Sequence, residues 1–100
     1  MKNIFELAVA AADEAVFNTQ EDLYCGFAWV VIRPARGEFV SWCKKNKIGD
    51  KGVYGGWSIS SYHFCHYNGQ SMTVKEAAAR AFAGALSGYG INVSVNSRAD

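Results

Sequence analysis

Two alanine-rich segments of the chain carry apolar residues at helical spacing. The first covers residues 3–18, where the acidic side chains lie away from the apolar stripe. The second follows residues 73–76, which match a capping box: the Thr73 hydroxyl meets a free amide and Glu76 reaches back. Gly88 or Gly90 ends that helix. A shorter stripe with lysines in its last turn predicts another helix over residues 35–46.

Three further segments have the patterns of strands. Residues 26–32 are continuously apolar and rich in β-branched and aromatic types, which predicts a central strand covered on both faces and ended by Pro34. Apolar and serine positions alternate over residues 57–60, as in a half-buried strand. After Ser61 the apolar phase shifts, which indicates a bulge, a bend or a second short strand. Alternation from Ile91 predicts a last strand that is wetted on one face.

These elements predict one small α+β domain over residues 1–100. We expect the order α-β-α-β-α-β, with a single layer of three or four strands packed with three helices. The chain has 100 residues, of which 50% are hydrophobic and 19% charged, so a disordered tail is excluded. No segment resembles a signal peptide or reaches the ~20 apolar residues of a membrane span. Three cysteines, an odd number, fit reduced thiols in a cytoplasm.

The formal charge of +1 hides an uneven distribution along the chain. Residues 1–25 hold one lysine against five carboxylates, a net charge of −4, and residues 33–51 hold six cations against two carboxylates, a net charge of +4. Two faces of opposite potential would result, although simple solubility accounts for the same pattern. The overall balance gives no general attraction to nucleic acid or to membranes, and the acidic first helix opposes a long basic groove.

Residues 63–66, His-Phe-Cys-His, are the most conspicuous group of reactive side chains. In a strand His63 and Cys65 would share a face while His66 points away, and no second ligand pair completes a zinc site. We therefore predict no metal and no cofactor. Cys25 and Cys43 are expected to be small core residues. Cys65 beside His63 or His66 is the one candidate for a reactive thiol, so a small Cys/His-dependent enzyme remains an alternative.

Aromatic and cationic side chains give a second kind of candidate site. Arg33 and Arg36 flank Pro34 at the end of the buried strand, where arginine forks suit phosphate or carboxylate groups and aromatic rings stack on a base. The predicted ligand-binding residues are Arg33, Arg36, Trp42, Tyr54, Trp57 and Arg98. The alternative is that both arginines are solvated loop charges and Trp57 belongs to the core. Residues 96–100 either fray or dock, and docking would bring Arg98 to a pocket rim.

Several stretches together resemble a group of small uncharacterised proteins of bacteriophages and prophages. They are Cys25-Gly26-Phe27-Ala28-Trp29-Val30, Phe39-Val40-Ser41-Trp42, Gly55-Gly56-Trp57, Gln70-Ser71-Met72 and the closing Gly90-Ile91…Ser97-Arg98-Ala99-Asp100. The resemblance covers nearly the whole chain, but not residues 63–66. It implies a phage-type protein made in the cytoplasm of an infected host, and it implies no activity.

Together these features predict a non-catalytic counter-defence protein that sequesters a small anionic, nucleotide-like ligand, such as an immune signalling nucleotide. A chain of this length encloses a deep pocket poorly, so we expect a homo-oligomer with sites at subunit interfaces. Direct inhibition of a host protein, through the basic segment or the acidic helix, is the alternative. Binding to nucleic acid or to a membrane is not expected.

Overall fold

The protein forms one four-stranded antiparallel sheet with helices packed against it. The computed structural model describes residues 1–100, and its elements in chain order are α1 (Lys2–Phe17), β1 (Gly26–Ile32), α2 (Glu38–Lys45), β2 (Asp50–Lys51), β3 (Trp57–Ser60), α3 (Ser61–Phe64), α4 (Met72–Ser87) and β4 (Val93–Ala99). The strand order is β2-β3-β1-β4, and every neighbouring pair is antiparallel. The small α+β domain is therefore confirmed, with one short strand and one short helix beyond the predicted order. No helix has the length and apolar character needed to cross a bilayer.

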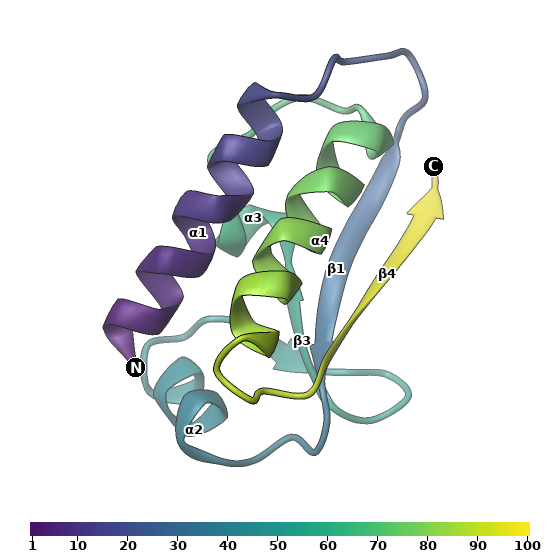
Figure 1. Cartoon of the computed structure of the whole chain (residues 1–100). Coiled ribbons are helices and arrows are strands. Elements are labelled where there is room, and N and C mark those ends of the chain that lie inside the picture. Colours follow the sequence, from purple (N-terminus) through teal and green to yellow (C-terminus); the bar gives the residue numbers. More distant parts are fainter.

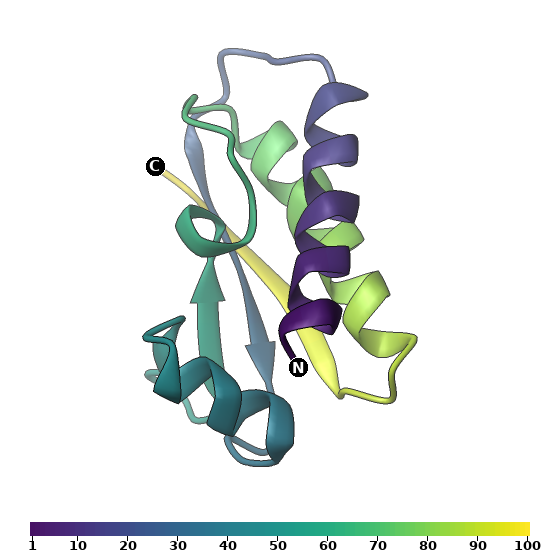
Figure 2. The same ribbon diagram turned by 90° about the vertical axis from the view of Figure 1, so that its left-hand side faces the viewer.

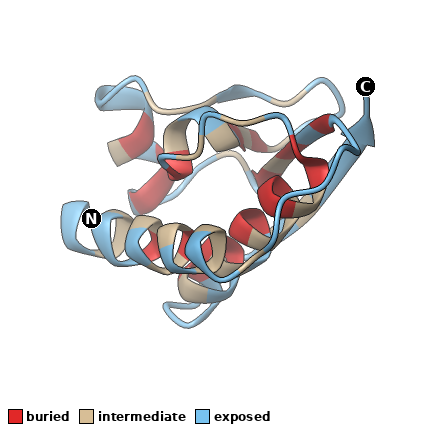
Figure 3. Ribbon diagram, turned by 90° about the horizontal axis from the view of Figure 1, so that it is seen from above, coloured by how far each residue is buried: buried red, intermediate tan, exposed pale blue.

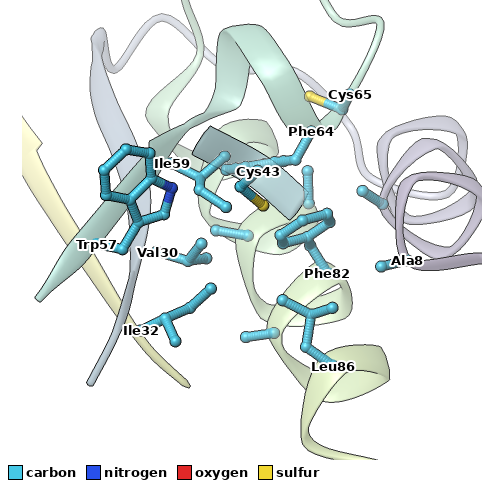
Figure 4. Packing of buried hydrophobic residues seen from close by; sticks show 14 of the residues in the cluster. Ala8, Val30, Ile32, Cys43, Trp57, Ile59, Phe64, Cys65, Phe82 and Leu86 are labelled. Atoms are coloured by element: carbon cyan, nitrogen blue, oxygen red, sulfur yellow. The ribbon is translucent and has the colours of Figure 1, made fainter. Parts of the chain in front are cut away.

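The core lies between β1 and the pair of long helices. Figures 1 and 2 show α1 and α4 side by side on one face of the sheet, with α2 at one end. Ala8 and Ala12 of α1 are fully buried, and such small side chains let two helices approach closely. Phe82 of α4 stacks on Phe64 with ring centroids 5.0 Å apart (Figure 4). In Figure 3 the buried residues gather between the helices and the sheet, whereas β4 is mostly exposed.

The first turn of α4 is held by the loop that joins α1 to β1. Ser71, rather than the predicted Thr73, is the N-cap, because its hydroxyl oxygen accepts from the amide of Val74 at 3.3 Å. The Thr73 hydroxyl instead donates to Asp22 at 2.7 Å, and the Ser71 hydroxyl donates to the same carboxylate at 2.9 Å. Glu76 accepts a hydrogen bond from Ser97 of β4. The Thr73 hydroxyl is therefore bonded to the carboxylate of Asp22, which is distant in sequence, and is not available for a local capping box.

Two other sequence expectations are corrected, and one open alternative is decided. The phase shift after Ser61 is one turn of helix, α3, rather than a bulge, a bend or a strand, so His63 and Cys65 do not share a strand face. Cys25 is exposed, because it precedes β1 at the end of the sheet, whereas Cys43 is buried as expected. The last residues do not fray: β4 pairs with β1 from Val93 to Ala99.

Candidate binding trough

The outer face of β1 is not covered by any helix. Successive side chains of a strand point to opposite faces, so Ala28, Val30 and Ile32 enter the core while Phe27, Trp29 and Val31 face away from it. Because α1 and α4 both lie on the core side, the second face depends on loops for cover. Phe27 is 44% exposed and Trp29 is only half-buried. The prediction of a strand covered on both faces is therefore wrong at this end of β1.

Polar side chains flank this aromatic row on both neighbouring strands. Trp29 lies between Ser60 of β3 and Asn96 of β4, and the register places Arg98 opposite Phe27. Ser60 and Asn96 are short, so Trp29 is left on the floor of a hollow that Phe27 and Arg98 also line. We call this hollow the sheet trough; it is lined by the outer faces of β1, β3 and β4 and by residues 50–55, 61–62 and 67–70. Its volume is about 980 Å³, within the usual range of small-molecule sites.

Four cations line the sheet trough against a single carboxylate, that of Asp50. They are Arg33, Lys51, Lys75 and Arg98. None of them forms an ion pair: the two ion pairs of the protein join Lys2 to Glu6 and His66 to Asp13. Helix α1, which carries three carboxylate residues, lies in the helical layer on the other face of the sheet (Figure 2). The trough is thus a positive surface on a protein whose net charge is only +1.

Lys75 is the one charged residue that is buried, at 8% exposure. Its Nζ donates to the carbonyl of Gly26 at 2.9 Å and lies 5.3 Å from the ring centroid of Phe27. An ammonium group has three donors, and this is its one hydrogen bond within the protein. The Arg98 guanidinium lies 5.9 Å from the same ring. Two cations therefore meet around Phe27 at one end of the trough, without an anion between them.

Three of the six residues predicted to bind ligand line the sheet trough, namely Arg33, Tyr54 and Arg98. Arg36 lies in a separate hollow of about 260 Å³ beyond the end of β1, which Arg33 also borders. Both arginines therefore line the small hollow, and Arg33 alone of the two also lines the sheet trough. Tyr54 is 92% exposed on the loop between β2 and β3.

The two predicted tryptophans serve the core instead of the trough. Trp57 faces the core side of β3, is 7% exposed, and donates its indole N–H to the carbonyl of Ile48 at 3.0 Å. Trp42 joins α2 to α1, with its ring centroid 5.3 Å from that of Phe5. Both indoles are thereby kept apart from Arg33 and Arg98. Trp57 is therefore a core residue, as the alternative drawn from the sequence had it.

Sequence reasoning did not select Phe27, Trp29 or Lys75 as trough residues. Phe27 and Trp29 lie at alternating positions of an apolar run, and the same run is expected whether the strand is buried on both faces or has an aromatic face open to a pocket. Lys75 could have been recognised from the sequence as an unusual buried lysine, because it falls on the apolar side of a helix beside Val74 and Ala78. A lysine in that position is buried unless the helix surface is open, and a buried lysine needs a partner.

The His-Phe-Cys-His segment lies apart from a reactive arrangement. The Cys65 thiol donates to the carbonyl of Ser61, and neither histidine is hydrogen-bonded to it. Burial raises the pKa of the Cys65 thiol above its ordinary value, which favours the non-nucleophilic protonated form. The Nδ1 of His66 lies 2.6 Å from a carboxylate oxygen of Asp13. No group of three or more His, Cys, Asp or Glu side chains is arranged to hold a metal ion.

Comparison with models of protein families, with characterised proteins and with solved structures gave no match for this chain. The resemblance to small phage proteins therefore stays a prediction. The side chains of the sheet trough, and the charges they bring together, are the basis on which a function is proposed.

Proposed function

We propose that the protein binds a small anionic, nucleotide-like ligand in the sheet trough and withholds it from other proteins. The observation that carries the proposal is the buried, unpaired ammonium of Lys75 beside Phe27 and Arg98. A buried charge is costly unless an opposite charge or several hydrogen bonds compensate it. Phosphate oxygens at this point would accept the remaining ammonium protons and face the guanidinium of Arg98.

The floor of the trough supports recognition of a planar base. Arg33 lies six positions after Phe27, so the row along β1 extends about 20 Å. Cations lie at both ends of this row, and Trp29 lies between them with its ring on the floor. Base–aromatic stacking contributes about 1–3 kcal/mol per base. A ligand with a base between two anionic groups matches this order of charge, ring and charge.

Binding, rather than turnover, fits the groups that the trough presents. Neither an imidazole nor a thiol is among its lining residues, which offer cations, aromatic rings, hydroxyls, amides and the one carboxylate of Asp50. Sequestration needs only affinity. In the setting that the phage resemblance implies, the ligand would be an immune signalling nucleotide of the infected host, bound in its cytoplasm by a homo-oligomer of this chain.

Calorimetry with cyclic dinucleotides and cyclic ADP-ribose isomers tests the proposal. Replacing Lys75 by Met removes one charge-assisted contact, about 1.5–3 kcal/mol, so the Kd of the bound nucleotide should rise roughly 10- to 100-fold. Trp29→Ala should weaken binding through lost stacking. Lys45→Met is the matched control, because Lys45 is exposed in the last turn of α2, outside the trough, and its loss should leave the Kd within about twofold.

Two results would contradict the proposal. One is the absence of binding by any of these nucleotides at about 100 µM, which corresponds to a very weak interaction. The other is affinity for single-stranded oligonucleotides that grows with their length, because base stacking and phosphate contacts also suit a nucleic-acid strand. A titration with oligonucleotides of increasing length therefore accompanies the calorimetry.

Direct inhibition of a host protein is the second candidate. The observation in its favour is the pair of apolar side chains on the loop between β2 and β3, Val53 at 91% and Tyr54 at 92% exposure. Affinity purification from host lysate separates the candidates. A stoichiometric protein partner that is lost with Val53→Ser and Tyr54→Ser supports inhibition, whereas a co-purifying nucleotide supports sequestration.

A further inference from the structure

The two edges of the sheet differ strongly in length. One edge is β2, which has only two residues, Asp50 and Lys51. The other edge is β4, which runs for seven residues from Val93 to Ala99 without a proline. β1 is the one strand paired with β4, so the other side of β4 is an edge of the sheet (Figure 1). A long, uncovered edge strand is a template for pairing with another strand, and proteins that remain monomeric usually block such edges.

The hydrogen-bond pattern identifies which backbone groups of β4 are free. The amide of Arg33 donates to the carbonyl of Asn92, and the amide of Asp100 donates to the carbonyl of Cys25. Even-numbered residues of β4 therefore point their backbone groups toward β1, and odd-numbered residues point theirs outward. The outward set is Val93, Val95, Ser97 and Ala99. No backbone group elsewhere in the chain pairs with them.

We infer that β4 pairs antiparallel with β4 of a second copy of this chain, about a twofold axis at Asn96. This register places Val95 opposite Ser97 of the partner subunit and Val93 opposite Ala99 of the partner subunit. All four outward residues of each strand then obtain backbone partners. Shifting the register by two residues would leave at least one of them unpaired.

Side chains on the trough face agree with this register. Arg98 lies opposite Ser94 of the partner subunit, so the arginines of the two copies do not face each other. Arg33 pairs with Asn92 on its own sheet, and Asn92 lies opposite Asp100 of the partner subunit. Arg33 and that aspartate thus share one cross-strand row, about 10 Å apart, with opposite charges. At the axis, two uncharged Asn96 side chains meet.

The dimer joins the two sheet troughs into one surface. A twofold axis perpendicular to an antiparallel sheet keeps the outer faces of both copies on the same side. The central row then reads Trp29, Asn96, Asn96 of the partner subunit and Trp29 of the partner subunit. A ligand with two bases could contact both copies, so this inference deepens the proposed function. Pairing of β4 does not itself require a ligand, and its test is made without one.

Cross-linking tests the register directly. At a non-hydrogen-bonded pair on the axis the two Cα atoms lie about 4.5 Å apart, which suits a disulfide. Asn96→Cys, in a Cys25→Ser background that removes the exposed thiol, should form a disulfide-linked dimer under mild oxidation. Ser94→Cys in the same background is the matched control. Its two Cα atoms would be more than about 13 Å apart, too far for a disulfide.

Charge at the axis gives a second test that leaves each subunit folded, because Asn96 is exposed. Light scattering should give twice the 10.9 kDa chain mass for the wild type. Asn96→Lys and Asn96→Asp should each weaken the dimer at least tenfold, and mixing the two variants should restore it as a heterodimer. Val95→Pro, which removes an outward N–H, should give monomers, whereas Val95→Ala should not.

Specific outcomes would overturn the inference. They are a wild-type mass of one chain at every protein concentration, equal cross-linking of the Ser94→Cys and Asn96→Cys proteins, or a dimer that Asn96→Lys leaves intact. Because no nucleotide is present, these results are independent of the calorimetry. A monomer that binds nucleotide would refute the dimer alone, and a dimer that binds none would refute the proposed ligand alone.

Discussion

Replacing Phe82 by Ala should remove a large part of the stability of the fold that positions Lys75. Phe82 is completely buried, and truncating such a phenylalanine costs about 3–5 kcal/mol. Its ring stacks on Phe64 at 5.0 Å and meets Phe5 edge-on at 5.9 Å, and aromatic pairs of this kind add about 0.5–1.5 kcal/mol each. We therefore expect the upper part of the range, about 4–5 kcal/mol. Domains of this size have a total stability of about 5–15 kcal/mol.

Urea unfolding followed by far-ultraviolet circular dichroism measures this loss as a lower midpoint at an unchanged slope. The matched control is Phe17→Ala, the same chemical change at a side chain that is 88% exposed at the end of α1. Its free energy of unfolding should stay within about 0.5 kcal/mol of the wild type. A cost below about 2 kcal/mol for Phe82→Ala, or equal costs for both variants, would refute the packing described for α4.

Three further predictions concern a carboxylate, a glycine and two thiols. Hydrogen bonds from the Thr73 and Ser71 hydroxyls hold the pKa of Asp22 below its ordinary value of 3.8. The ionised carboxylate therefore stabilises the folded protein above pH 3.8, and this stabilisation is lost as the pH falls through the lower pKa of the folded state. Urea titrations across this range should show a flatter pH profile for Asp22→Asn. Gly56→Ala should destabilise by about 1–3 kcal/mol, seen as a lower Tm, because φ is +76° and a new Cβ would lie 2.6 Å from a side chain of β1. Cys25 should react with a thiol reagent in the native protein, whereas burial raises the pKa of Cys43 to about 12 and delays its reaction until unfolding.

Each of these predictions has its own control or contrary result. Loss of stability in acid at the same pH for Asp22→Asn and the wild type would exclude Asp22 as the group responsible. Gly55→Ala is the control for Gly56→Ala. Gly55 also has a positive φ, but nothing lies within 4 Å of a new Cβ, so this variant measures backbone strain without a steric clash. A smaller loss for Gly55→Ala is expected. Equal rates of modification at Cys25 and Cys43 in the native protein would contradict the burial of Cys43.

Much of the secondary structure could be predicted because it depends on spacing along the chain. The bounds of β1 were predicted at 26–32 from one apolar run, and α1 differs from its prediction by one residue at each end. The capping of α4 could not be predicted in the same way. Thr73 has the right spacing for a capping box, but its hydroxyl donates to Asp22, which is 51 residues away in sequence. Local patterns do not include such a competing partner.

The candidate site was predictable only in part, for a related reason. Arg33, Tyr54 and Arg98 were selected by residue type, and all three line the sheet trough. Trp57 was selected by the same criterion and belongs to the core, since the pleat turns it toward the helices. Residue type indicates which chemistry a side chain can supply. It does not indicate on which face of the sheet that side chain lies.

The sequence by itself determined the three longer helices, the central strand and a single small α+β domain, because periodicity and turn chemistry act between neighbouring residues. Only the tertiary structure decided which face of β1 stays open. Both long helices pack on the face of Val30, so the alternate residues Phe27 and Trp29 are left to form a floor. Packing of α4 against β1 then brings Lys75 beside Phe27, 48 positions earlier in the chain. Burial of apolar area selects one covered face, and the positive trough is a consequence of that selection.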